Sequence, residues 1–149
     1  MKTRQSGVAI VEFALILPLL LLLTMITTEF GRAIYQYNTI VKSLRGAARY
    51  LSVQTPSTVL TPNTVAITEA RNLVVFGNVS GTGSAMVPGL TVGNVATPTW
   101  QTAGSDPLIN TVTITVTGYT FHPLVTGVFG TTFGNISYPD ISATMRSPS

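Results

Sequence analysis

The chain has 149 residues, enough for one modest domain besides a membrane segment. Charged residues make up only 9 % of it, against about a quarter in ordinary soluble proteins, and beyond residue 50 they are Glu69, Arg71, Asp106, Asp140 and Arg146. The net charge of +3 includes two basic residues at the extreme N-terminus and does not favour a nucleic-acid partner, and the lack of cysteine excludes disulfides.

The segment from Val8 to Ile26 reads VAIVEFALILPLLLLLTMI and is long enough as a helix to cross about 28 Å of hydrocarbon. Thirteen of its residues are Leu, Ile, Val or Phe, which together favour insertion by about 6 kcal/mol. The carboxylate of Glu12 opposes insertion by about 3 kcal/mol. We therefore expect a transmembrane helix over 8–26 in which Glu12 needs a charge partner from outside the segment.

A short basic stretch with Lys2 and Arg4 precedes this segment and leads into Gly7. A cut after Gly7 would free the amine of Val8 and make Glu12 the fifth residue of the new chain. This pattern resembles type IV prepilins. The resemblance implies that a prepilin peptidase removes residues 1–7 on the cytoplasmic side, and that the glutamate meets the amine of a neighbouring subunit.

Two other interpretations of the same stretch remain open. The first is an uncleaved membrane anchor with Glu12 at the headgroup boundary. The second is a secretory signal, against which two features argue: the apolar run is too long, and no small-x-small cleavage site follows Ile26.

The sequence after Glu12 resembles the TadE-like minor pilins (pseudopilins) of Tad/Flp pilus systems over about residues 5–50. The stretches that carry the resemblance are GVAIVEFALILPLLLLL, EFGRAIYQYN and RGAARY. The family motif residues fall on Glu12, Phe13, Pro18, Glu29, Gly31 and Arg32. The family often has a glutamate between the arginine and the glycine near Arg45, and this chain reads Arg45-Gly46 directly.

Orientation in the membrane follows from this resemblance, because basic residues lie on both sides of the segment. The resemblance places the amino end in the cytoplasm. Pro18 removes one backbone donor and is expected to bend or loosen the helix. That bend either helps the helix to pack in a fibre core or is merely tolerated.

The helix is predicted to continue beyond the membrane segment as an amphipathic helix over 27–55. Its apolar positions are spaced by three and four residues. They are Ile34, Tyr37, Val41, Leu44, Ala48 and Leu51. Thr55-Pro56 ends the helix, which gives about 45 residues and about 70 Å in all. The apolar stripe either seats the chain's own domain or forms an inter-subunit face.

Residues 56–149 are predicted to form an extracytoplasmic domain. Thr61-Pro62 is typical of a helix start and Gly77 of its end, and a glycine-rich loop follows over 77–93. The GTGS stretch in that loop has no lysine and does not indicate a phosphate site. The helix charges Glu69 and Arg71 are expected to be solvated.

Alternation over 111–117 predicts a strand with Val112, Ile114 and Val116 facing inward, and a final strand is expected around 141–146. A hairpin or loop is expected over 126–135. The predicted fold is α+β and pilin-like: a long N-terminal helix packed on a small antiparallel sheet of three or four strands.

No motif for catalysis, for a cofactor or for a metal is present in the sequence, and the single histidine, His122, is expected to be structural. The chain is therefore interpreted as the substrate of an enzyme rather than as an enzyme. The expected partners are a prepilin peptidase, other pilin and pseudopilin subunits, the inner-membrane assembly platform and the lipid bilayer. The alternative function is a permanently anchored inner-membrane accessory protein. An adhesin that exposes a threonine-rich sheet is compatible with the pilin interpretation.

Overall fold

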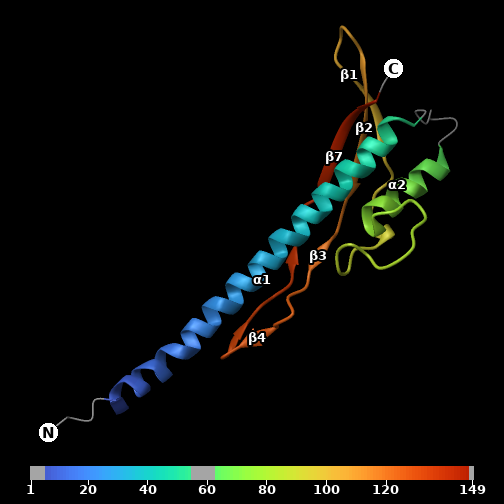
Figure 1. Cartoon of the computed structure of the whole chain (residues 1–149). Coiled ribbons are helices and arrows are strands. Elements are labelled where there is room, and N and C mark those ends of the chain that lie inside the picture. Colours follow the sequence, from blue (N-terminus) through green and yellow to red (C-terminus); the bar gives the residue numbers. More distant parts are fainter. Residues whose placement is uncertain (1–5, 55–62, 148–149) are drawn as a thin grey trace. The chain divides into compact units, whose positions relative to one another are not determined.

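The computed structural model describes residues 6–54 and 63–147 (Figure 1). Its longest element is the helix α1 (Ser6–Ser52), 47 residues long. An antiparallel sheet follows, so the predicted α+β fold is confirmed. The helix ends three residues before the predicted boundary, and Thr55-Pro56 itself lies outside the described residues, as do Lys2 and Arg4.

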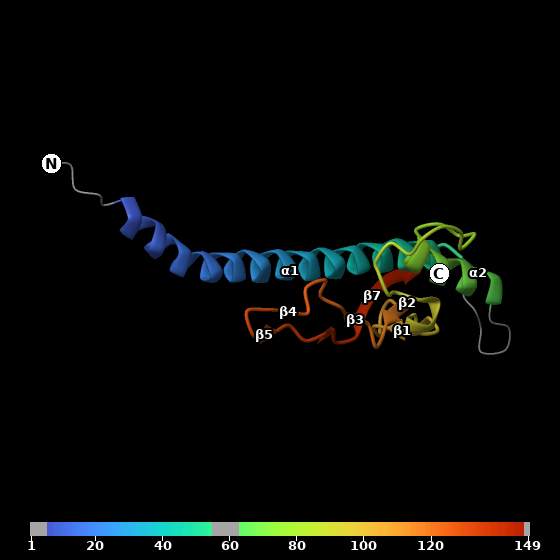
Figure 2. The same cartoon turned by 90° about the horizontal axis from the view of Figure 1, so that it is seen from below.

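α1 runs without interruption through Pro18, and Figure 2 shows it bending in its blue N-terminal part. Hydroxyls at the end of the apolar segment are satisfied within the helix itself. Thr24, Thr27 and Thr28 donate to carbonyl oxygens four residues back at 2.8–2.9 Å. These bonds let polar side chains occupy apolar surroundings without a lost hydrogen bond.

The described residues form two compact units. The first consists of α1 up to Ile34 together with His122–Asn135, which contains the short hairpin of β4 (Gly127–Val128) and β5 (Thr131–Thr132). The second contains Tyr35–Phe121 and the chain from Ile136 onward. The membrane-type part of α1 and its outer part therefore belong to different units.

A three-stranded antiparallel sheet forms the centre of the second unit. Its strands are β1 (Thr99–Ala103), β2 (Ile109–Val116) and β7 (Ile141–Ser147), in the order β1-β2-β7. Val112, Ile114 and Val116 of β2 are buried, which confirms the predicted alternation. In the register of the sheet, Val112 lies opposite both Trp100 and Met145.

The smaller elements complete this unit. α2 (Thr64–Phe76) is capped by Asn63, whose side chain accepts from the Ala66 amide. The cap expected at Thr61-Pro62 falls outside the described residues. Gly77 ends α2 in a left-handed conformation at φ 74°, as glycine permits. A 3-10 turn (Val92–Asn94) follows, and β3 (Thr120–Phe121) pairs with β6 (Ile136–Ser137).

The hydrophobic core of the second unit joins α1, α2 and the sheet. Leu44, Ala48 and Leu51 of α1 are fully buried in it, together with Val74 of α2 and Ile114 of β2. Ser147 of β7 donates to the Ser52 carbonyl at 3.0 Å and ties the last strand to the end of α1. The C-terminal part of α1 thus contributes buried residues to the core of the second unit.

Candidate functional site

The most unusual surface of the protein is the first half of α1. By length and composition this helix can cross a membrane, and no residue of its most apolar stretch is buried by the rest of the described chain. Val8, Phe13 and Leu15 are 61 %, 59 % and 76 % exposed. Apolar surface of this extent is unfavourable in water, so lipid or protein must cover it.

Gly7 and Val8 lie in the first turn of α1, and Glu12 follows one turn later. Glu12 is exposed among apolar neighbours, and no hydrogen bond or ion pair to another described residue is present at its carboxylate. A charge in this position is costly in lipid unless a cation approaches it. The structure therefore presents Glu12 on a surface where a partner from another chain has access.

The motif residues Glu29 and Arg32 form an ion pair in the first unit. Arg32 donates through Nη1 to Glu29 Oε2 at 2.6 Å, one helical turn apart. Glu29 Oε1 accepts from the Leu124 amide at 3.3 Å, and Arg32 Nη2 donates to the His122 carbonyl at 3.4 Å. The pair thus fastens the segment His122–Asn135 to α1, a role that local sequence did not indicate because its partners lie about 90 residues away.

Gly31 lies between these two residues and is exposed. A Cβ atom added there would meet no atom of the chain within 4 Å. The neighbouring side chains Phe30, Ile34 and Tyr35 are 61 %, 48 % and 71 % exposed. Folding of this chain therefore does not explain the glycine, and small residues on exposed helices allow another backbone to approach closely.

The predicted packing stripe is divided between two environments. Leu44, Ala48 and Leu51 are fully buried and Val41 is half-buried, whereas Ile34 is 48 % and Tyr37 40 % exposed. Tyr37 still meets Tyr138 edge to face, with ring centroids 5.7 Å apart.

The buried face is rotated from the predicted one because small and polar residues contribute to it. Ala47 is fully buried, and Gln36 is buried where its Oε1 accepts from the Tyr119 hydroxyl at 2.8 Å. Ile40 is also fully buried. Ala and Gln carry too little hydrophobic signal to mark a core position in the sequence, whereas Ile40 adjoins the predicted stripe at Val41 and shares the buried face with Leu44.

Glu69 is not simply solvated, in contrast to the prediction from the sequence. Its carboxylate accepts a hydrogen bond from the Tyr50 hydroxyl. This bond, followed by burial and by the negative charge of Glu69, raises the pKa of Tyr50 above its ordinary value of 10.0. Arg71 donates to the Thr97 hydroxyl at 2.8 Å. These contacts fix α2 to its surroundings.

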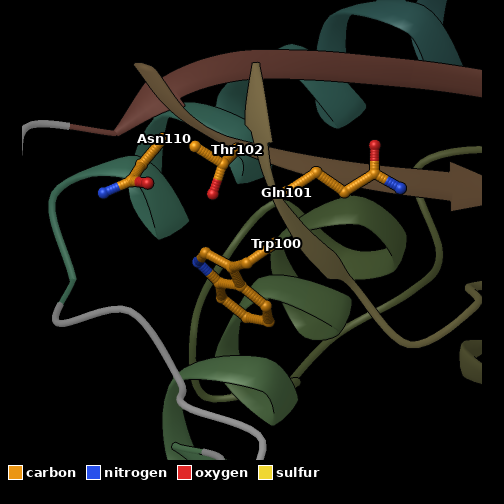
Figure 3. A pocket seen from close by; sticks show the side chains of 4 residues that line it. All are labelled: Trp100, Gln101, Thr102 and Asn110. Carbon is orange, nitrogen blue, oxygen red and sulfur yellow. The ribbon is translucent and has the colours of Figure 1, made fainter. Parts of the chain in front are cut away.

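The pockets of the described residues are lined by few side chains that could act as acid, base or nucleophile. One of about 160 Å³ is lined by Trp100, Gln101, Thr102 and Asn110 of β1 and β2 (Figure 3). The Trp100 indole N–H is buried there without a hydrogen-bond partner among the described residues. His122 Nδ1 lies 3.1 Å from Asn135 Oδ1, and His122 is not among the residues that line this pocket. Within residues 6–54 and 63–147 no cluster of three metal-binding side chains occurs.

An exposed apolar helix that is followed by a small antiparallel sheet fits a pilin-like protein with one membrane-type helix among the described residues. Residues 7–49 match the family model described as TadE-like protein, which confirms the resemblance seen in the sequence. The match is confined to this segment, which contains most of α1. No curated protein and no solved structure matches the chain.

Proposed function

We propose that this protein is a minor pilin or pseudopilin of a Tad-type (type IVc) pilus used for surface attachment. A prepilin peptidase cuts it after Gly7 while it is held in the inner membrane with its domain outside the cytoplasm. The mature chain, beginning at Val8, then joins other pilin and pseudopilin subunits at the assembly platform. The TadE-like match over residues 7–49 supports this proposal.

The observation that carries the proposal is the uncovered first half of α1 with a single carboxylate on it. In a fibre, the apolar side chains exchange lipid contacts for contacts with other pilin helices. Glu12 pairs with the Val8 amine of a neighbour. This pairing lowers the free-energy cost of a charge in apolar surroundings and fixes the axial register of the two subunits. The amine exists only after cleavage, so processing and assembly are coupled.

Intact-mass measurement tests the processing step. Co-expression with a prepilin peptidase should lower the mass by that of the first seven residues, and Gly7→Leu should block the cut because a branched side chain does not fit a subsite shaped for glycine. Gly46→Leu is the matched control, since Gly46 is also a helical glycine with free space around it. A mass that never falls, or a cut beyond Ile26, contradicts the proposal.

Glu12→Gln separates assembly from insertion. Insertion should persist or improve because a carboxylate is removed from lipid. Fibre incorporation should collapse, because breaking a buried charge pair costs about 3–5 kcal/mol at each contact. Glu69→Gln, at a glutamate of the outer domain, serves as the control and should leave incorporation intact. Normal incorporation of the Glu12 variant would show that this glutamate is only tolerated.

A permanently anchored accessory protein of the assembly machine is the competing function. It predicts that the chain remains in the inner membrane of piliated cells and is absent from sheared fibres. Recovery of the mature chain in sheared fibres supports the minor-pilin function, and retention of all of it in the membrane supports the accessory.

A further inference from the structure

The segment His122–Asn135 is held next to the outer end of the membrane-type helix. Its attachment points are the Leu124 amide on Glu29 and the His122 carbonyl on Arg32. Glu29 lies three residues beyond Ile26, which is about 4.5 Å of helix rise. Figure 2 shows β4 and β5 beside the part of α1 that belongs to the same compact unit. The segment therefore lies at the level where a bilayer would end.

The composition of this segment suits a membrane surface. From Pro107 to Pro139 the chain carries no Asp, Glu, Lys or Arg, and its single histidine, His122, lies at the attachment point. Two of its large apolar side chains are strongly exposed: Leu124 at 78 %, the highest value for a large apolar side chain among the described residues, and Phe129 at 64 %.

The turn of the hairpin supplies an independent observation. Val128 pairs with Thr131, so Phe129 and Gly130 form a two-residue turn. Both have positive φ, 50° and 80°, a geometry that favours Asn-Gly. Phe129 is the single non-glycine residue with positive φ in the described part of the chain. Folding alone does not favour phenylalanine there, and strained residues of this kind mark places with a function.

We propose that the hairpin over 122–135 is a lipid-contacting element that places Phe129 and Leu124 at the boundary between headgroups and acyl chains of the outer leaflet. Lipid is the expected occupant because the hairpin itself carries no charged residue and belongs to the same compact unit as the exposed apolar part of α1, and the charges at its attachment, Glu29 and Arg32, are paired with each other. The hairpin stays at the boundary rather than deeper, because its two-residue strands leave backbone groups unpaired that hydrocarbon does not tolerate. The Glu29–Arg32 pair fixes the position of the hairpin along α1 through the Leu124 amide and the His122 carbonyl.

This inference goes beyond the proposed function and requires neither cleavage nor a fibre. Its test uses the full chain, which has no cysteine, reconstituted in vesicles of phosphatidylethanolamine and phosphatidylglycerol. Phe129→Cys and Leu124→Cys are each labelled with a polarity-sensitive fluorophore and exposed to lipids that carry a quencher at shallow or deep positions. Thr102→Cys, an exposed site on β1 in the other unit, is the matched control.

Labels at 129 and 124 should emit at shorter wavelength than the label at 102 and be quenched at least about twofold more strongly by the shallow quencher. Phe129→Asn suits the turn and keeps the hairpin, and quenching of the label at 124 should fall when this substitution is added. Equal quenching at 102 and 129 would overturn the proposal. So would a wavelength shift that appears only after another pilin subunit is added, because the occupant would then be protein.

Discussion

The two halves of α1 follow the same helical geometry and face opposite environments. In the first half, Leu20 is 46 % exposed and Ile16 52 % exposed, although nearly every residue is apolar. In the second half, Ile40 and Leu44 are fully buried, although charged residues surround them in sequence. Exposure on this helix is therefore set by what the rest of the chain covers, and the exposed half is the part that the proposed function assigns to lipid and partner subunits.

The largest effect should come from equal truncations in the two halves. Leu44→Ala removes a fully buried side chain and should lower the free energy of unfolding of the domain by about 2–5 kcal/mol. Leu20→Ala makes the same chemical change on the exposed half and should leave it within about 0.5 kcal/mol. Thermal unfolding of both full-length variants in detergent micelles gives the comparison. Equal losses would mean that the first half is also part of the folded core.

A smaller effect is expected at the junction between the halves. Arg32→Gln leaves the buried Glu29 carboxylate without its cation and should weaken attachment of the 122–135 hairpin by about 1–3 kcal/mol. Hydrogen exchange at the Leu124 amide should accelerate accordingly. Arg45→Gln, at an exposed cation of the same helix, is the control and should leave that amide unchanged. Unaltered exchange in Arg32→Gln would show that the pair does not hold the hairpin.

Gly31 sharpens the comparison, because folding and assembly should respond in opposite directions. Gly31→Ala has open space and should stabilise the helix by up to about 1 kcal/mol. Gly31→Leu should also fold, since no atom of the chain lies within 4 Å of an added Cβ. Incorporation into fibres should fall from Ala to Leu as the side chain grows. Full incorporation of the Leu variant would show that no partner packs closely there.

The smallest effect is a pH dependence within the outer domain. The pKa of Tyr50 is raised, so the stabilisation linked to its hydroxyl is complete below pH 10, the ordinary pKa, and is lost as pH rises through the folded-state value. Glu69→Ala removes both the hydrogen-bond acceptor and the charge and should return the pKa of Tyr50 toward 10.0. An absorbance titration of tyrosinate measures the change. An unchanged titration curve would contradict the hydrogen bond as the main cause.

The sequence alone predicted the elements whose residues follow one simple pattern, such as a long apolar run or a strict alternation. The apolar run from Val8 to Ile26 and the alternation around Ile114 predicted the long helix and the central strand, because lipid and a one-sided sheet impose simple patterns. The motif glutamate and arginine at 29 and 32 were also found, but only through resemblance to a family.

The rest depended on contacts between distant residues. Nothing near Glu29 in the sequence indicates that the Leu124 amide is its partner. The buried positions of Gln36 and Ala47 were missed because their burial follows from Tyr119 and from the shape of the core rather than from hydrophobicity. The positive φ of Phe129 was likewise hidden, since phenylalanine is not a residue that predicts such a turn.

The most direct test of the account is site-specific photocrosslinking from the exposed half of α1 in piliated cells. A photoreactive residue at Phe13, which is 59 % exposed, should give adducts with other pilin subunits that are recovered in sheared fibres. The same residue at Leu44, which is fully buried, should give no intermolecular adduct. Adducts from position 13 only to polytopic membrane proteins, with none in sheared fibres, would contradict the account.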